Sequence, residues 1–247
     1  MVNINDVYQT VLTIANKDNR GYITPEEYNR LADIAQNEIF ESYFNKQLMY
    51  EAGGLYNADF SDPIITTAEK INTFYKSGNL SQSSGTWAFP TDFYKLGSVQ
   101  VNSIEADFIS HKDVKFINQS PLTYPVTTQP VYTIVGSAIR IYPSTITSGV
   151  NIEYLKAPNA PKWGYIMPTA AQLAAGVPNE PIYDSTVFDP ATDSYSATAK
   201  SLNFELHTSE YSELIYKILT LAGVTIKQAD IAGFAQSKDQ QLQATEQ

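Results

Sequence analysis

The chain changes its hydrophobic period twice, and this change limits its possible folds more than any other feature. Near both ends apolar residues recur at helical spacing, whereas the middle holds short segments rich in Val, Ile, Tyr and Phe. An amphipathic helix needs a partner for its apolar stripe. We therefore predict an α+β fold, in which a discontinuous helical bundle from residues 1–80 and 207–247 carries an inserted antiparallel β-sandwich or barrel over 81–206.

Three helices are expected in the N-terminal part. The first covers residues 3–17, where apolar side chains follow one stripe. The second begins at a capping box, in which Thr24 is the N-cap residue and Glu27 lies three positions later. A third, shorter helix is expected from Pro63, a residue suited to a first helical position, to about Gly78.

The second helix is apolar over more than half of its girth. Beside its main stripe it carries four further large apolar residues, Ile34, Phe40, Phe44 and Leu48. A helix of this kind is buried on two sides, either within its own domain or against another subunit. We therefore take these four residues as interface candidates.

The middle of the chain predicts several strands separated by turn residues. Residues 157–195 are rich in proline and are expected to form a long loop, a feature typical of a binding excursion. The expected strands cover residues 93–102, 113–118, 130–136, 138–143 and 149–155.

Helical periodicity returns at Thr208, and Asp230 is expected to cap a last helix. The apolar residues of that last helix are sparse, namely Ile231, Phe234 and Leu242. Two interpretations remain: a frayed terminal tail, or a segment that folds when it docks on a partner. The second makes these three residues further interface candidates.

A calcium loop is the sharpest motif match in the sequence. If Gly21 is position 6 of an EF-hand loop, Asn16, Asp18 and Glu27 fall at ligand positions 1, 3 and 12. However, Asn16 replaces a carboxylate, and Arg20 places a cation where a ligand belongs. The same residues are explained by a turn at Gly21 and a helix cap at Glu27, and we predict no calcium binding there.

Composition excludes most catalytic chemistry. The chain has no cysteine and two histidines, and it contains none of the GxSxG, GxGxxG, GxxxxGK[ST] or HExxH motifs. We therefore expect no enzyme activity, no catalytic residue, no metal ion and no cofactor.

The net charge of −10 and the small number of arginines argue against specific nucleic-acid binding. No apolar run is long enough to span a membrane, and no secretory signal is visible at the N-terminus.

The 17 tyrosines leave two interpretations open. Tyrosine supplies large, rigid, amphipathic contact area at protein interfaces. It also stacks on sugars or bases. Because arginines are few, the protein-interface interpretation is favoured over the nucleic-acid one.

Four stretches resemble head–tail connector proteins of short-tailed phages, in particular the ring or adaptor proteins below the portal of crAss-like phages. The two longer stretches are VYQTVLTIANKDNRGYITPEEYNRLADIAQNEIFESYF at residues 7–44 and NFELHTSEYSELIYKILTLAGVTIKQADI at residues 203–231. Two central stretches, PVYTIVGSAIRIYP at 130–143 and IEYLKAPNAPKW at 152–163, also resemble this family.

The resemblance implies a virion structural protein at the head–tail interface, assembled in the host bacterial cytoplasm. It implies a homo-oligomeric ring of roughly a dozen copies that contacts the portal and other connector or tail proteins and lets DNA pass without specific binding. The net charge of −10 is consistent with such a channel, because an acidic protein offers few phosphate contacts that would hold the DNA. The alternatives are a β-rich carbohydrate- or receptor-binding tail component and a calcium-dependent interaction module.

Overall fold

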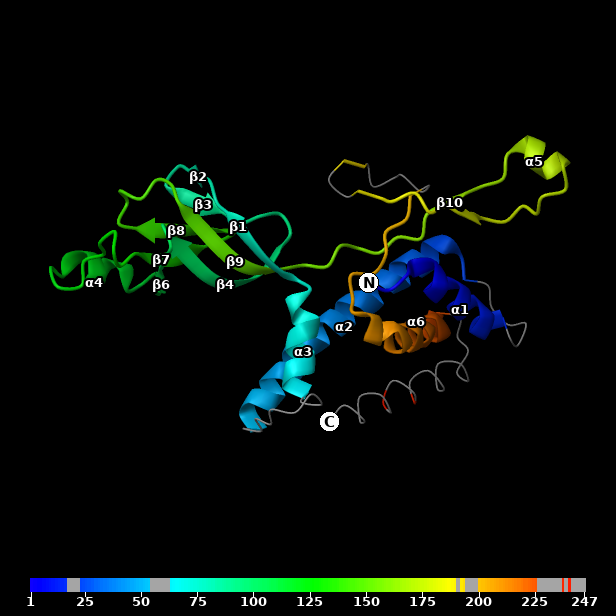
Figure 1. Ribbon diagram of the computed structural model, residues 1–247, viewed down its shortest axis with the longest axis horizontal. Coiled ribbons are helices and arrows are strands. Elements are labelled where there is room, and N and C mark those ends of the chain that lie inside the picture. Colours follow the sequence, from blue (N-terminus) through cyan, green and yellow to red (C-terminus); the bar gives the residue numbers. More distant parts are fainter. Residues whose placement is uncertain are drawn as a thin grey trace. The chain divides into compact units, whose positions relative to one another are not determined.

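The chain folds into two compact units with mixed α+β architecture (Figure 1). A computed structural model describes residues 1–16, 23–53, 63–189, 192–193 and 200–225, together with residues 237 and 240. Unit 1 comprises Met1–Thr73 and Pro158–Gln247, and unit 2 comprises Phe74–Ala157. The chain thus divides after residues 73 and 157 rather than after residues 80 and 206, because the segment after residue 157 packs with the helices.

Unit 1 contains helices from both chain ends and a small two-stranded sheet. Helix α6 contacts both α1 and α2, and α2 also contacts α3. The elements of unit 1 are α1 (Ile4–Asn16), α2 (Pro25–Gly53), α3 (Pro63–Asn72), β10 (Tyr165–Ile166), α5 (Ala170–Ala174), β11 (Ile182–Tyr183), the 3₁₀ helix η1 (Thr208–Glu210) and α6 (Tyr211–Thr225).

The core of unit 1 is made by residues that are distant in the sequence. The backbone of Val2 pairs with that of Phe204 in an isolated bridge, so the N-terminus is held by the segment before α6. Burial of these aliphatic and aromatic side chains is the main term that stabilises the unit. The buried core residues include Ile4, Val7, Tyr8 and Val11 of α1, Tyr28, Ala32, Ala35, Ile39, Phe40 and Tyr43 of α2, and Leu214, Ile215, Ile218, Leu219 and Ala222 of α6.

The predicted capping box of α2 is confirmed. The backbone N–H of Thr24 donates to Oε2 of Glu27 over 3.0 Å, and the backbone N–H of Glu27 donates to Oγ1 of Thr24 over 3.3 Å. These bonds satisfy backbone donors that the first helical turn leaves without partners. The cap therefore fixes where α2 begins.

Unit 2 holds two sheets that share one hydrophobic core. The first has the strand order β1-β9-β4-β5 and is antiparallel, and the second has the order β2-β3-β8-β7-β6, with β6 parallel to β7. In the described part of the chain, neither sheet closes into a barrel. The elements are β1 (Tyr75–Asn79), β2 (Gln82–Ser83), β3 (Thr86–Ala88), β4 (Phe93–Val101), β5 (Ile104–Glu105), β6 (Asp107–Phe108), α4 (Val114–Gln119), β7 (Val131–Val135), β8 (Ala138–Tyr142) and β9 (Val150–Lys156).

The core of unit 2 follows the alternation of its strands. In β9, Val150, Ile152 and Tyr154 are buried, as expected for one face of a strand. They join Trp87 of β3 and residues of β4, β7 and β8 in one buried cluster. Both sheets therefore contribute to the same apolar interior.

The chain enters unit 2 through β1 and leaves it through β9, and these two strands are neighbours. Tyr75 pairs with Leu155, and the backbone N–H of Lys156 donates to the carbonyl of Phe74 over 2.9 Å. The two connections to unit 1 therefore start side by side.

Two predicted elements are wrong. The expected strand at residues 113–118 is instead helix α4 (Val114–Gln119), because the backbone N–H groups of Phe116 and Ile117 bond locally to the carbonyl of Asp113. The third helix ends at Asn72 instead of continuing to Gly78, because residues 75–79 pair with β9. Long-range strand pairing overrides the local helical pattern there.

Candidate functional site

The predicted excursion forms a hairpin arm on unit 1. We call residues 165–183 the arm; it consists of β10, α5 and β11 and is drawn in yellow-green in Figure 1. Only two residue pairs join its strands, Tyr165 with Tyr183 and Ile166 with Ile182. The 157–195 region is therefore not a structureless loop.

An aromatic stack anchors the arm. The ring of Trp163 lies 5.9 Å from that of Tyr165 and 5.7 Å from that of Tyr183, measured between centroids. The ring of Trp163 also contacts that of Tyr8, with 4.4 Å between centroids. Gly164 is required here, because a Cβ on it would lie 2.4 Å from the carbonyl carbon of Lys200. The base of the arm is thus part of the folded core.

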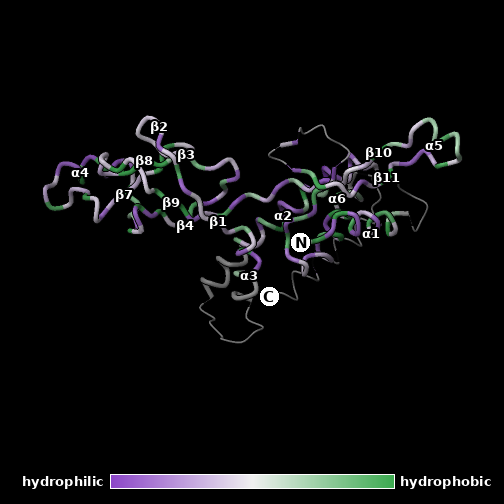
Figure 2. The backbone as a smooth tube through the Cα atoms, turned by 45° about the horizontal axis from the view of Figure 1, so that its top comes forward, coloured by the Kyte–Doolittle hydropathy of each residue, from purple (hydrophilic) through white to green (hydrophobic). Residues whose placement is uncertain are grey.

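Beyond this base, the arm has a defined conformation but little burial. Helix α5 is closed by a capping box, in which the backbone N–H of Thr169 donates to Oε1 of Gln172 over 2.8 Å. No residue of α5 is buried. Figure 2 shows hydrophobic colouring around α5. The exposed large apolar residues of the arm are Ile166 (50%), Met167 (48%), Leu173 (40%) and Ile182 (45%).

A polar clamp attaches the start of this region to α2. Asn29 accepts a 2.7 Å hydrogen bond from the backbone N–H of Trp163, and its side chain donates to the Trp163 carbonyl over 3.2 Å. Two turns later, Nε2 of Gln36 donates to the carbonyl of Asn159 over 2.8 Å. Oε1 of Gln36 accepts from the backbone N–H of Glu205 over 3.0 Å. Gln36 is fully buried, so these bonds offset the cost of burying its amide.

Sequence reasoning missed this clamp. The available signal was the spacing of Asn29 and Gln36, which places two amides on one face of α2 at i and i+7. Nothing in their neighbourhood indicated which distant backbone they would bind.

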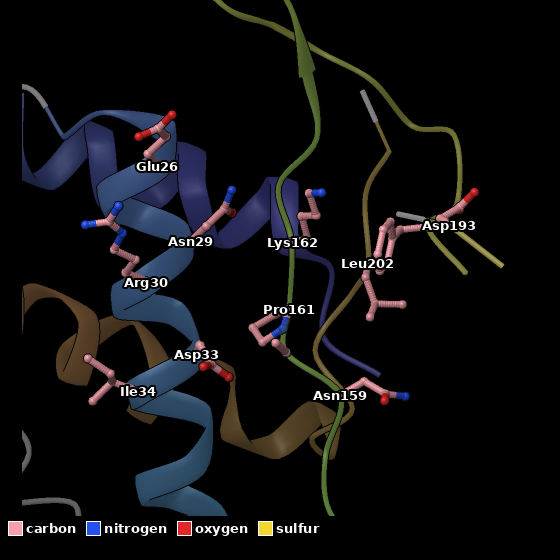
Figure 3. A pocket seen from close by; sticks show the side chains of 12 residues that line it. Glu26, Asn29, Arg30, Asp33, Ile34, Asn159, Pro161, Lys162, Asp193 and Leu202 are labelled. Carbon is pink, nitrogen blue, oxygen red and sulfur yellow. The ribbon is translucent and has the colours of Figure 1, made fainter. Parts of the chain in front are cut away.

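A pocket of about 720 Å³ lies between α2 and the segments around residues 160 and 202; we call it the α2 pocket (Figure 3). Figure 3 shows α2 on one side and the segment with Pro161 and Lys162 on the other. The lining combines apolar residues with charges of both signs. It comprises Glu26, Asn29, Arg30, Asp33, Ile34, Asn159, Ala160, Pro161, Lys162, Phe188, Asp193 and Leu202.

Partial burial shifts the pKa of two charged side chains in the α2 pocket. Burial raises the pKa of the Asp33 carboxyl, although a hydrogen bond from Asn37 opposes the shift. Burial lowers the pKa of the Lys162 ammonium, against the opposite effect of the carboxylate of Asp193. The Lys162 ammonium lies 4.6 Å from the centroid of the Phe188 ring, a cation–π contact.

The chemistry of this pocket is that of a binding surface. Among the described residues no three His, Asp or Glu side chains are grouped to hold a metal ion. A lining that mixes apolar side chains with a few charges is typical of a binding site.

Unit 2 carries a second, smaller hollow of about 580 Å³, which we call the aromatic pocket. The rings of Phe89 and Phe93 stack there at 4.0 Å, almost parallel. Tyr94 and Lys95 also line it, so this pocket combines aromatic rings with a few polar groups.

The structure places the predicted interface candidates in different environments. Ile34 is 46% exposed and lines the α2 pocket, whereas Phe40 is buried and therefore belongs to the core of unit 1. Phe44 packs edge-to-face on Phe40 at 5.2 Å. The side chain of Leu48 lies outside the part of the chain that the structure describes. The same holds for the whole of Ile231, Phe234 and Leu242.

The structure also describes the three candidate ligands of the rejected calcium loop to different extents. Asn16 is the last residue of α1, and Glu27 is engaged in the cap of α2. Asp18 lies outside the described residues. The geometry of the loop itself therefore stays a sequence-based prediction.

Two comparisons with known proteins identify no relative of this chain. No family model matches the chain, and no curated protein sequence matches it. Among the helices that the structure describes, none is both long and apolar enough to cross a membrane.

Proposed function

We propose that this protein is a structural subunit of a phage head–tail connector. It forms a ring of roughly a dozen copies below the portal, joins the capsid vertex to the tail and lines the channel through which DNA leaves. Its partners are other copies of itself, the portal and neighbouring connector or tail proteins. It acts at the head–tail interface of the virion, after assembly in the bacterial cytoplasm, and it catalyses no reaction.

The observation that carries this proposal is the arm. A hairpin with a firmly anchored base, a capped helix and four exposed large apolar side chains leaves hydrophobic area for a partner to cover. Such a device suits assembly rather than turnover of a small substrate. The resemblance of residues 7–44 and 203–231 to connector proteins supports the same role.

The charge of the chain is consistent with passage of DNA. A channel lined by a protein of net charge −10 offers few phosphate contacts, so it does not hold the polyanion as it moves.

The finer architecture belongs to this proposal. We infer that the helices of both chain ends act as one bundle that builds the ring, and that the two sheets of unit 2 form a small sandwich presented as an insert. The shared buried cluster of unit 2 supports the sandwich, and the contacts of α6 with α1 and α2 support the bundle.

Electron microscopy of the purified protein, alone and mixed with the portal protein of the same virus, tests the proposal. We expect closed rings that sit coaxially on the portal. A protein that neither forms rings nor binds the portal would contradict a connector role.

The aromatic pocket favours a second candidate function, a carbohydrate- or receptor-binding tail component. Stacked rings of Phe89 and Phe93 beside Tyr94 resemble surfaces on which sugar rings pack. Binding on a glycan array that is lost in Phe93→Ala would favour this function over the connector.

A further inference from the structure

We infer that the arm of one copy docks in the α2 pocket of the next copy, so that the copies associate head to tail. This inference rests on the proposed ring and names the contact that builds it. The partner is a second copy of this chain, and the two surfaces in contact are different parts of unit 1.

The arm has the properties of an inserted element. Its capping box holds α5 in shape, although a five-residue helix without a buried face is too short to be stable by itself in water. Met167 and Leu173 present apolar side chains on this shaped segment. A pre-shaped segment loses less conformational entropy when it binds than a flexible one does.

The α2 pocket has the properties of the receiving surface. Ile34, Ala160, Pro161, Phe188 and Leu202 supply apolar lining, and the volume of about 720 Å³ accommodates several aliphatic side chains. Its walls are held in place by the polar clamp, in which Asn29 and Gln36 bind the backbone of residues 159–163. The pocket is therefore formed before a partner arrives.

Charge favours another copy of this chain as the partner. Two molecules of net charge −10 repel one another, yet the arm carries only one charged residue, Glu180, in 19 positions. The average charged content of the chain, 17%, would place about three there. The lining of the acceptor carries two cations, Arg30 and Lys162, beside three acids, so Glu180 has a cation to pair with. An almost uncharged arm is what an acidic copy can accept.

The two surfaces also determine the symmetry. Because the arm and the α2 pocket are different surfaces, their contact is heterologous and repeats from copy to copy. Such a contact closes into a ring when its rotation divides a full turn. An arm-to-arm contact would instead stop at a two-fold dimer.

Disulfide trapping tests the contact directly, because the natural chain has no cysteine. Leu173→Cys places a thiol on the arm, and Ile34→Cys places one on the α2 pocket; both positions are partly exposed, so neither change disturbs the core. Mild oxidation of the double variant should give a ladder of covalent oligomers that a reductant collapses. The matched control combines Ile34→Cys with Leu122→Cys, a 95% exposed position in unit 2, and should give no ladder.

The single variants and one charge variant complete the test. If Leu173→Cys alone gives abundant dimers, or if the double variant stops at the dimer, the head-to-tail contact is wrong. Equal products from the double variant and the control also overturn it. Leu173→Asp should weaken self-association in sedimentation experiments by about tenfold or more, with melting unchanged. Rings on the portal without a ladder would refute this contact but not the connector role, whereas a ladder without portal rings would refute only the role.

Discussion

At the residue scale, the carboxylate of Glu27 illustrates how one side chain serves two competing explanations. In sequence it occupies the last ligand position of a calcium loop, and in the structure it accepts hydrogen bonds from the backbone N–H and the hydroxyl of Thr24. Those bonds stabilise the charged form and lower the pKa of Glu27. The residue is therefore committed to the start of α2.

This cap makes part of the stability dependent on pH. Because the pKa of Glu27 is lower in the folded chain than in the unfolded one, its contribution is present above the unfolded pKa and is lost as the pH falls through the folded pKa. Glu27→Gln keeps an acceptor oxygen but cannot titrate. We expect the wild-type chain to lose its advantage over Glu27→Gln as the pH falls below the usual pKa of a glutamate and through the lower pKa of the folded chain. Urea unfolding of both proteins across this range checks the expectation, and a constant difference would contradict it.

Calcium affinity is a second prediction at this scale. Asn16 lacks the charge of the usual first ligand, Arg20 adds a cation, and Glu27 would have to leave its cap. We expect no calcium binding tighter than roughly 1 mM. Isothermal titration calorimetry measures this directly, and micromolar binding that Glu27→Gln abolishes would show that the loop is a true calcium site.

Residues whose partners are near in sequence could be predicted, and residues with distant partners could not. Thr24 and Glu27 lie three positions apart, so the pattern alone identifies their bonds. His207 likewise bonds to a near neighbour: it caps the 3₁₀ helix η1 by accepting from the backbone N–H of Ser209. Gln36, by contrast, binds the backbone of residues 159 and 205, and no local pattern encodes those partners.

At the element scale, a buried ion pair holds α3 to the segment before α6. Nζ of Lys70 lies 2.5 Å from Oε1 of Glu210, and their side chains are 12% and 3% exposed. Loss of one partner of a buried pair leaves an uncompensated charge, which costs more than the pair itself contributes.

We expect Lys70→Met to lower the free energy of unfolding by about 3 kcal/mol. The double variant Lys70→Met/Glu210→Gln should regain most of this loss, because the buried charge is then gone. Lys76→Met is the matched control, since the pair of Lys76 with Asp92 is more exposed and should cost only about 0.5 kcal/mol. Denaturant unfolding of the wild-type chain and the three variants measures these free energies. Equal losses of unfolding free energy in Lys70→Met and Lys76→Met would contradict the expectation.

The elements that could be predicted are those whose pattern is long enough to be read locally. Helices α1, α2 and α6 each have more than ten residues of apolar periodicity. Strands β2, β5 and β6 have two residues each, which is too short for an alternating pattern to be recognised. Strand β6 in addition pairs with β7, which lies far along the chain. Helix α5 was missed, although its Thr169 and Gln172 carry the sequence signal of a capping box.

At the scale of the whole molecule, the insertion of unit 2 through neighbouring strands implies that it is separable. Phe74 and Lys156 are hydrogen-bonded to each other, so the two chain ends of the insert lie about one strand spacing apart.

We expect a chain in which a short Gly/Ser linker replaces residues 74–157 to keep a folded, helical unit 1. Residues 74–157 alone should fold as a β-rich unit, because their buried cluster lies within the unit. Circular dichroism and thermal melting of the two proteins check both expectations. Aggregation of the shortened chain would show that unit 1 depends on its insert.

The discontinuity of unit 1 also determines the order of events during synthesis. Val7 and Val11 of α1 emerge from the ribosome early, whereas Leu214 and Ile218 of α6 follow about 200 residues later. At about 5–20 residues per second this is a delay of about 10–40 s. Unit 2, which is continuous in sequence, can complete its fold during that interval. Until α6 emerges, the apolar faces of α1 and α2 that pack against it lack this covering helix.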